Sequence, residues 1–107
     1  MQTVADILKV KGDDVWSVSP EATVFEALEQ LADKNVGALV VLDEGRLVGI
    51  LSERDYARRI ALQGKASKET PVREVLTGRV LCVGPERTVN ECMALMTDKH
   101  VRHLPVV

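Results

Sequence analysis

One stretch of this sequence is written twice: VWSVSPEATVFEALEQLADKNVGALVV at residues 15–41 returns as VLCVGPERTVNECMALMTDKHVRHLPV at residues 80–106. A shift of 65 positions superposes twelve identical residues, among them the Pro-Glu and Asp-Lys pairs. An apolar set upstream matches at a shift of 68, with Val4, Ile7 and Leu8 corresponding to Val72, Val75 and Leu76. A repeat of this kind predicts two copies of one supersecondary unit that stack to share a core.

The composition is that of a globular domain and argues against several classes of partner. The chain has 107 residues, 46% of them hydrophobic and 28% charged. No apolar run approaches the roughly 18 residues of a membrane span, and residues 1–11 lack the apolar stretch of a secretory signal, so we expect a cytoplasmic protein without a membrane partner. The net charge of −2 and the absence of a basic run argue against nucleic-acid binding. Cys82 and Cys92 lack disulfide or metal spacing and are expected to be reduced.

Each copy is predicted to contain the same order of elements. The elements of the first copy are an amphipathic segment at 4–8, a strand at 15–18, a helix from Thr23 to Asn35, strands at 36–42 and 47–51, and a helix from Glu53 to about Leu62 that ends near Gly64. Capping boxes are expected at Thr23 with Glu26, at Thr88 with Glu91, and at Ser52 with Asp55. The order of strand, helix, strand, strand, helix predicts an α/β (α+β) fold.

The repeat sets the expected domain boundaries. We predict repeat 1 at residues 1–64, a polar linker at 65–71 and repeat 2 at 72–107, packed with pseudo-two-fold symmetry. The second copy ends before the last strand and helix, so it is expected to be incomplete, either as part of a longer protein or with a neighbouring molecule supplying the rest. Strands are expected at residues 80–83 and 104–107, and the second of these lacks a hairpin partner.

Three segments resemble a known family. They are the run Gly37–Val41, the segment Gly49–Asp55, and the second-copy string Val101–Val106. Together, at repeat spacing, they are similar to a tandem cystathionine-beta-synthase (CBS) domain pair, or Bateman module. The resemblance implies a regulatory module that binds an adenosine-containing ligand such as AMP, ATP, NAD or S-adenosylmethionine in clefts between the repeats. It also implies a homodimer formed through the helices.

The resemblance places the ribose of such a ligand at Asp55. A carboxylate can accept hydrogen bonds from both ribose hydroxyls, and family members use the matching aspartate in this way. Ser52, at the helix start, is expected to hold a phosphate or a ribose oxygen, and Arg54 is expected to pair with a phosphate. The alternative is that Ser52 and Asp55 only cap the helix and that Arg54 is an exposed cation.

The adenine site implied by the resemblance lies at the start of the first hairpin. Main-chain groups of Gly37 and Ala38 are expected to bind the base. The aliphatic side chains that are candidates to enclose it are Val18, Val36 and Leu39, although ordinary core packing explains each of them equally well. Gly49 is expected to relieve packing rather than touch ligand. The second copy has Arg102 and His103 in place of Gly37 and Ala38, so its pocket is expected to be narrower, with Arg102 directed at a phosphate.

Other functions have less support. The serines have no evident base partner and no phosphate-binding glycine loop is present, so we do not expect an enzyme. His100, His103 and Cys92 lack the spacing of a metal site, and no metal is expected. A structural dimerisation module without a ligand remains the alternative function.

Overall fold

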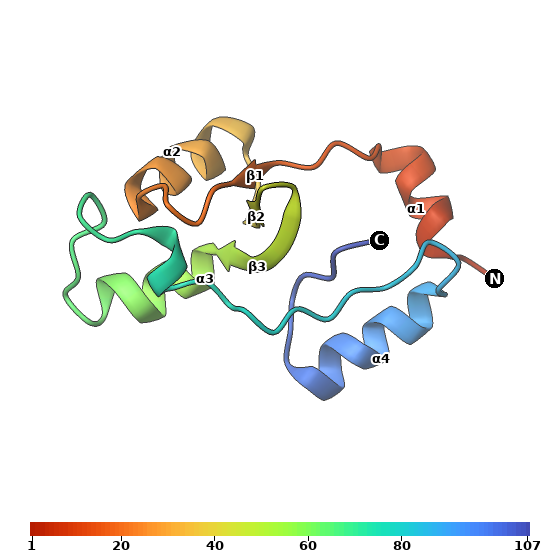
Figure 1. Cartoon of the computed structure of the whole chain (residues 1–107). Coiled ribbons are helices and arrows are strands. Elements are labelled where there is room, and N and C mark those ends of the chain that lie inside the picture. Colours follow the sequence, from red (N-terminus) through yellow and green to blue (C-terminus); the bar gives the residue numbers. More distant parts are fainter. The chain divides into compact units, whose positions relative to one another are not determined.

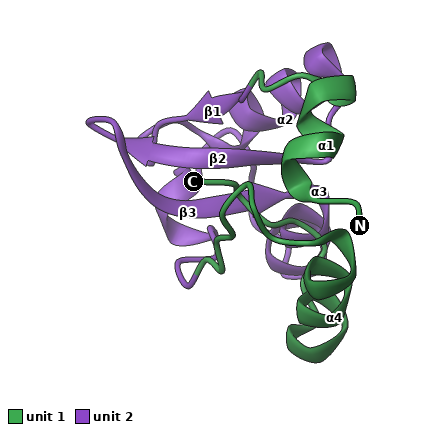
Figure 2. Cartoon of the chain, turned by 90° about the vertical axis from the view of Figure 1, so that its right-hand side faces the viewer, with its two compact units in different colours: residues 1–14, 80–107 green, residues 15–79 purple.

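The computed structural model describes all 107 residues, and they form two compact units. Unit 1 contains residues 1–14 and 80–107, and unit 2 contains residues 15–79 (Figure 2). The elements are α1 (Val4–Lys11), β1 (Ser17–Val18), α2 (Val24–Lys34), β2 (Ala38–Asp43), β3 (Arg46–Ser52), α3 (Glu53–Asp55), η1 (Tyr56–Ala61), η2 (Val72–Glu74) and α4 (Val89–Lys99) (Figure 1). This confirms the α+β class. None of the helices combines the length and the apolar character that a membrane span needs.

Unit 2 is built on a three-stranded sheet in the order β1-β2-β3. The short strand β1 pairs in parallel with β2 through Val18 and Val41. Strands β2 and β3 form the predicted hairpin. Its turn uses Glu44 and Gly45 at positive φ (51° and 82°), as a two-residue hairpin turn of the favoured hand requires.

The core of unit 2 lies on one face of this sheet. Alternation along β2 buries Leu39 and Val41 completely, and Leu51 joins them from β3. Helix α2 adds Val24, Ala27 and Leu31, η1 adds Ile60, and the segment at η2 adds Val72 and Val75. Residues from both sequence copies therefore share this core.

The expected helix from Glu53 to Leu62 is present but its geometry differs from the prediction. After one turn of α-helix the chain continues as the π-helix η1. Its wider turns are closed by hydrogen bonds between residues five apart, such as Leu62 N to Ala57 O (3.1 Å). Tyr56 and Ile60 both pack against the core in this arrangement. Their spacing of four fits an α-helix as well, so the sequence pattern does not reveal the π geometry.

Unit 1 packs α1 and α4 around a smaller core of Val4, Val83 and Cys92. The prediction of strands at 80–83 and 104–107 is wrong. In their place the structure has a single parallel bridge, between Val83 and Val106. That bridge is the equivalent, shifted by 65, of the Val18–Val41 pair in unit 2. In unit 2 the ladder continues because Val40 N donates to Trp16 O (3.2 Å), whereas the equivalent residue in unit 1 is Pro105, which has no N–H.

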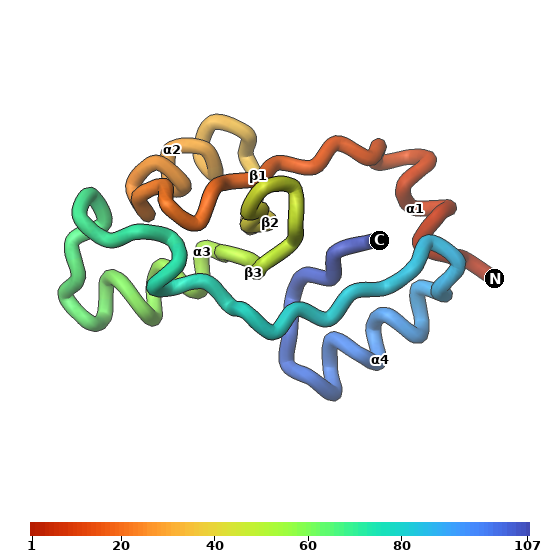
Figure 3. The backbone as a smooth tube through the Cα atoms, in the orientation of Figure 1, coloured from red at the N-terminus to blue at the C-terminus, as the bar shows by residue number.

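The leading helices α1 and η2 each bond to the body of the other sequence copy. Three hydrogen bonds do this in unit 1: Val4 N to Arg87 O (2.8 Å), Ala5 N to Pro85 O (2.8 Å) and Val89 N to Gln2 O (3.0 Å). Unit 2 has the same three at the repeat-shifted positions: Val72 N to Ala22 O (2.8 Å), Arg73 N to Pro20 O (2.9 Å) and Val24 N to Thr70 O (2.8 Å). In Figure 3 the red N-terminal helix and the blue C-terminal part meet within unit 1 as these bonds require. The compact units thus combine the two copies.

The expected caps are confirmed at two helices and only in part at a third. Thr88 and Glu91 form a reciprocal box at α4, and Ser52 and Asp55 form one at α3. At α2 the Thr23 hydroxyl accepts from Glu26 N, but the Glu26 carboxylate does not reach back to the backbone of Thr23. A box that the sequence analysis did not identify, Thr3 with Asp6, caps α1.

The two boxes in unit 1 make its stability dependent on pH. The N–H and then the hydroxyl of the capping threonine hold the pKa of Asp6 below its ordinary 3.8 and that of Glu91 below 4.5. Because folding lowers each pKa, this stabilisation is present above the unfolded value and is lost as the pH falls through the folded value. We expect Tm to fall on acidification below about pH 4.5, and to fall less in the double variant Asp6→Asn, Glu91→Gln. Equal pH profiles of Tm in the two proteins would contradict this.

Candidate functional site

The candidate site lies where β3 passes into α3. Ser52 N and Ser52 Oγ both donate to Asp55 Oδ2, at 3.0 and 2.9 Å, and Asp55 N donates back to Ser52 Oγ at 3.1 Å. The box fixes the orientation of the Asp55 carboxylate. Beside it, Ala38 is the strand partner of Ser52, and Glu53 N donates to Gly37 O at 3.0 Å. The fold thus brings together four of the residues singled out in the sequence.

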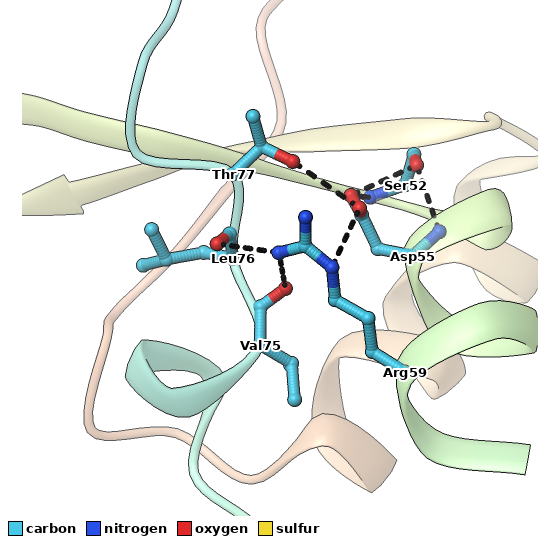
Figure 4. Close-up of polar contacts among 6 residues, drawn as sticks. All are labelled: Ser52, Asp55, Arg59, Val75, Leu76 and Thr77. Carbon is cyan, nitrogen blue, oxygen red and sulfur yellow. Dashed lines mark hydrogen bonds and ion pairs between the residues drawn. The ribbon is translucent and has the colours of Figure 1, made fainter. Parts of the chain in front are cut away.

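Two further residues that the sequence analysis missed also surround Asp55 (Figure 4). Thr77 Oγ1 donates to Asp55 Oδ1 at 3.2 Å, and Arg59 Nε lies 3.9 Å from the same oxygen. The Asp55 side chain is 13% exposed. Arg59 stands one helical turn after Asp55, a spacing that could have signalled the ion pair. Thr77 carries no such local signal because the chain places it 22 residues away.

Arg54 is the cation of α3 and immediately precedes Asp55 in the sequence. Its side chain is half-buried and takes part in no hydrogen bond or ion pair. Arg58, one turn later, is exposed. An unpaired guanidinium can donate two parallel N–H hydrogen bonds to an anionic group such as a phosphate.

The remaining predicted residues occupy other environments. Leu39 is fully buried in the core of unit 2, and Val18 is half-buried against it, so the side chains of both serve packing in this structure. Arg102 and His103 are exposed and belong to unit 1. No group of three or more His, Cys, Asp or Glu side chains is placed to hold a metal ion.

Comparison with known proteins assigns the family. The profile described as CBS domain matches the chain twice, at residues 3–62 and 72–107. The chain belongs to the CBS domain family. It is a pair of CBS domains, a regulatory type of module, and the two matches correspond to the two copies of the sequence repeat.

Two curated relatives show the extent of the likeness. A mitochondrial CBS domain-containing protein of Arabidopsis thaliana is 41% identical over 98% of this chain and 55% of its own length. A CBS domain-containing protein of Bacillus subtilis is 35% identical over 100% of this chain and 74% of its own. The CBS pair therefore spans about half of the first relative and about three quarters of the second.

Solved structures share the fold. A protein with CBS domains from Burkholderia ambifaria has a TM-score of 0.95 and 44% identity, covering 99% of this chain and 80% of that one. A CBS domain pair in complex with 5′-methylthioadenosine and S-adenosyl-L-methionine has a TM-score of 0.85 and 25% identity, covering 100% and 81%. A hexameric CBS-CP12 protein from cyanobacteria has a TM-score of 0.80 and 26% identity, covering 88% and 56%.

Proposed function

We propose that this CBS pair is a non-catalytic regulatory module whose unit 2 binds an adenosine-containing ligand, such as AMP, ATP or NAD, and reports nucleotide status to a partner. The observation that carries the proposal is the oriented, half-buried carboxylate of Asp55, which directly follows the unpaired Arg54 in the sequence. The related CBS pair in complex with 5′-methylthioadenosine and S-adenosyl-L-methionine supports an adenosine ligand.

Each part of the ligand has a matching group in unit 2. The Asp55 carboxylate accepts the ribose hydroxyls, since an ionised carboxylate is an acceptor-only group with two oxygens. Arg54 binds phosphate oxygens, whereas the Ser52 hydroxyl gives its one proton to Asp55 Oδ2 and serves the cap. The base lies at the start of β2, where Ala38 contributes main-chain groups, because Gly37 O already accepts from Glu53 N.

The test is ligand affinity in two matched aspartate variants. Asp55→Asn keeps an oxygen acceptor for the Ser52 cap but replaces the other carboxylate oxygen and removes the charge. We expect the affinity for AMP, measured by titration calorimetry, to fall about 10- to 100-fold, the effect of losing a charge-assisted hydrogen bond of about 1.5–3 kcal/mol. Asp6→Asn, the same change in the α1 box, is expected to leave affinity unchanged.

The outcomes separate this proposal from its rival. If AMP, ATP, NAD and S-adenosylmethionine all fail to bind the unaltered protein, the adenosine proposal is wrong. The rival is a structural dimerisation module, which is favoured by the finding that both Asp55 oxygens already have partners within the chain. It predicts a homodimer whose dissociation constant, measured by analytical ultracentrifugation, does not change with nucleotide.

A further inference from the structure

The segment Val75–Thr77 is bound to the Asp55 site by several contacts at once (Figure 4). Arg59 Nη1 donates to the carbonyl oxygens of Val75 (3.1 Å) and Leu76 (3.0 Å). The backbone of Thr77 pairs with Ile50 in both directions, Ile50 N to Thr77 O at 3.0 Å and Thr77 N to Ile50 O at 2.9 Å. These bonds fix the position from which the Thr77 hydroxyl reaches Asp55 Oδ1.

The acceptor capacity of Asp55 is almost used by these internal donors. A carboxylate has about four lone-pair positions. Oδ2 accepts two hydrogen bonds from Ser52, and Oδ1 accepts one from Thr77, with Arg59 Nε facing it at 3.9 Å. Two ribose hydroxyls need two acceptor positions. A diol that binds Asp55 through both hydroxyls must therefore displace one internal donor.

The Thr77 hydroxyl is the donor most easily displaced. Its hydrogen bond, at 3.2 Å, is the longest of the three and is long for an O–H···O contact. The two bonds from Ser52 belong to the reciprocal cap of α3, so their loss would also uncap the helix. Rotation of the Thr77 side chain leaves its backbone pairing with Ile50 in place.

We propose that the Thr77 hydroxyl is an internal competitor for the ribose site of Asp55, and that Arg59 is the positioning residue that holds it there. This inference rests on the proposed function. The competitor lowers the affinity of unit 2 for its ligand. Ligand binding at Asp55 also displaces the hydroxyl of Thr77, which lies three residues before the chain enters unit 1 at Val80.

Adenosine is the probe that tests this, because it carries the ribose diol without a phosphate. Thr77→Val removes the hydroxyl at nearly constant shape, and we expect adenosine to bind about two- to fivefold more tightly, the effect of removing one weak hydrogen bond from the free state. Thr77→Ser keeps the hydroxyl and is expected to retain the original affinity. Thr97→Val, on the exposed surface of α4, is the matched control with no expected effect.

A double-mutant cycle tests the role of Arg59. Arg59→Met is expected to raise adenosine affinity in the unaltered background and to add nothing in the Thr77→Val background. Weaker or unchanged binding in Thr77→Val overturns the competition while the proposed function stands. Additive effects of the two substitutions overturn the positioning role. If adenosine binds no variant, AMP, which carries the same ribose diol, replaces it in the same comparison. Absence of AMP, ATP, NAD and S-adenosylmethionine binding to every variant overturns the proposed function and this inference with it.

Discussion

Replacing Gly49 by alanine is expected to destabilise unit 2 by about 1–3 kcal/mol, the usual effect of adding a methyl group to a closely packed site. A Cβ on Gly49 would lie 2.6 Å from Leu76 Cδ1 and 2.7 Å from the backbone oxygen of Thr77. The Leu76 side chain can turn away, but the Thr77 oxygen is held by its bond to Ile50 N. The segment 75–77 therefore has to move off β3. For a unit of this size we expect Tm to fall by roughly 5–20 °C.

The neighbouring Gly78 provides the matched control for this substitution. A Cβ there meets only Leu76 Cδ1, at 3.7 Å, which is an ordinary contact. Gly78→Ala is expected to leave Tm unchanged or to raise it slightly, because alanine restricts the unfolded chain. Thermal unfolding followed by circular dichroism measures both variants. Equal melting of Gly49→Ala, Gly78→Ala and the unaltered protein would show that the segment does not pack on β3 as described.

The same contact shows how far the sequence could predict the fold. The repeat correctly predicts the α2 helix, the β2–β3 hairpin and the class, since these follow from local periodicity, caps and turn residues. Gly49 was expected to relieve packing, which the structure confirms, but the segment that approaches it could not be named. Leu76 and Thr77 are distant in sequence, and no periodic pattern specifies a pairing of Thr77 with Ile50.

The candidate site also has one part that the sequence predicts and one part that it does not. Ser52 and Asp55 are three residues apart, so their reciprocal cap follows from sequence alone. The Thr77 contact to Asp55 depends on the exchange of leading helices, which brings η2 and the residues after it into unit 2. The repeat in the sequence identifies the two copies and their shifts. It does not show that the leading helix of each copy packs with the body of the other copy.

That exchange leads to the second large effect, which concerns fragments of the chain. We expect a fragment of residues 15–79 to fold cooperatively and a fragment of residues 1–64, one whole sequence repeat, to be unfolded. The core of the fragment 1–64 would lack Val72 and Val75, which are both fully buried in the complete chain. Burial of two valines contributes roughly 3–6 kcal/mol, which is comparable to the whole stability of a domain of this size. The fragment would also lose the partners of Val24 N and Ile50 N.

Urea unfolding of both fragments, followed by circular dichroism, measures this difference. A cooperative transition in residues 1–64 equal to that of residues 15–79 would contradict the exchange. A control in the complete chain removes the concern that any fragment is too small to fold. Val72→Ala should lower the stability of unit 2 by about 2 kcal/mol, whereas Val10→Ala, at a position that is 92% exposed, should have no effect. If Val72→Ala and Val10→Ala change the stability equally, residues after 71 do not belong to the core of the first copy, and each sequence repeat forms its own core.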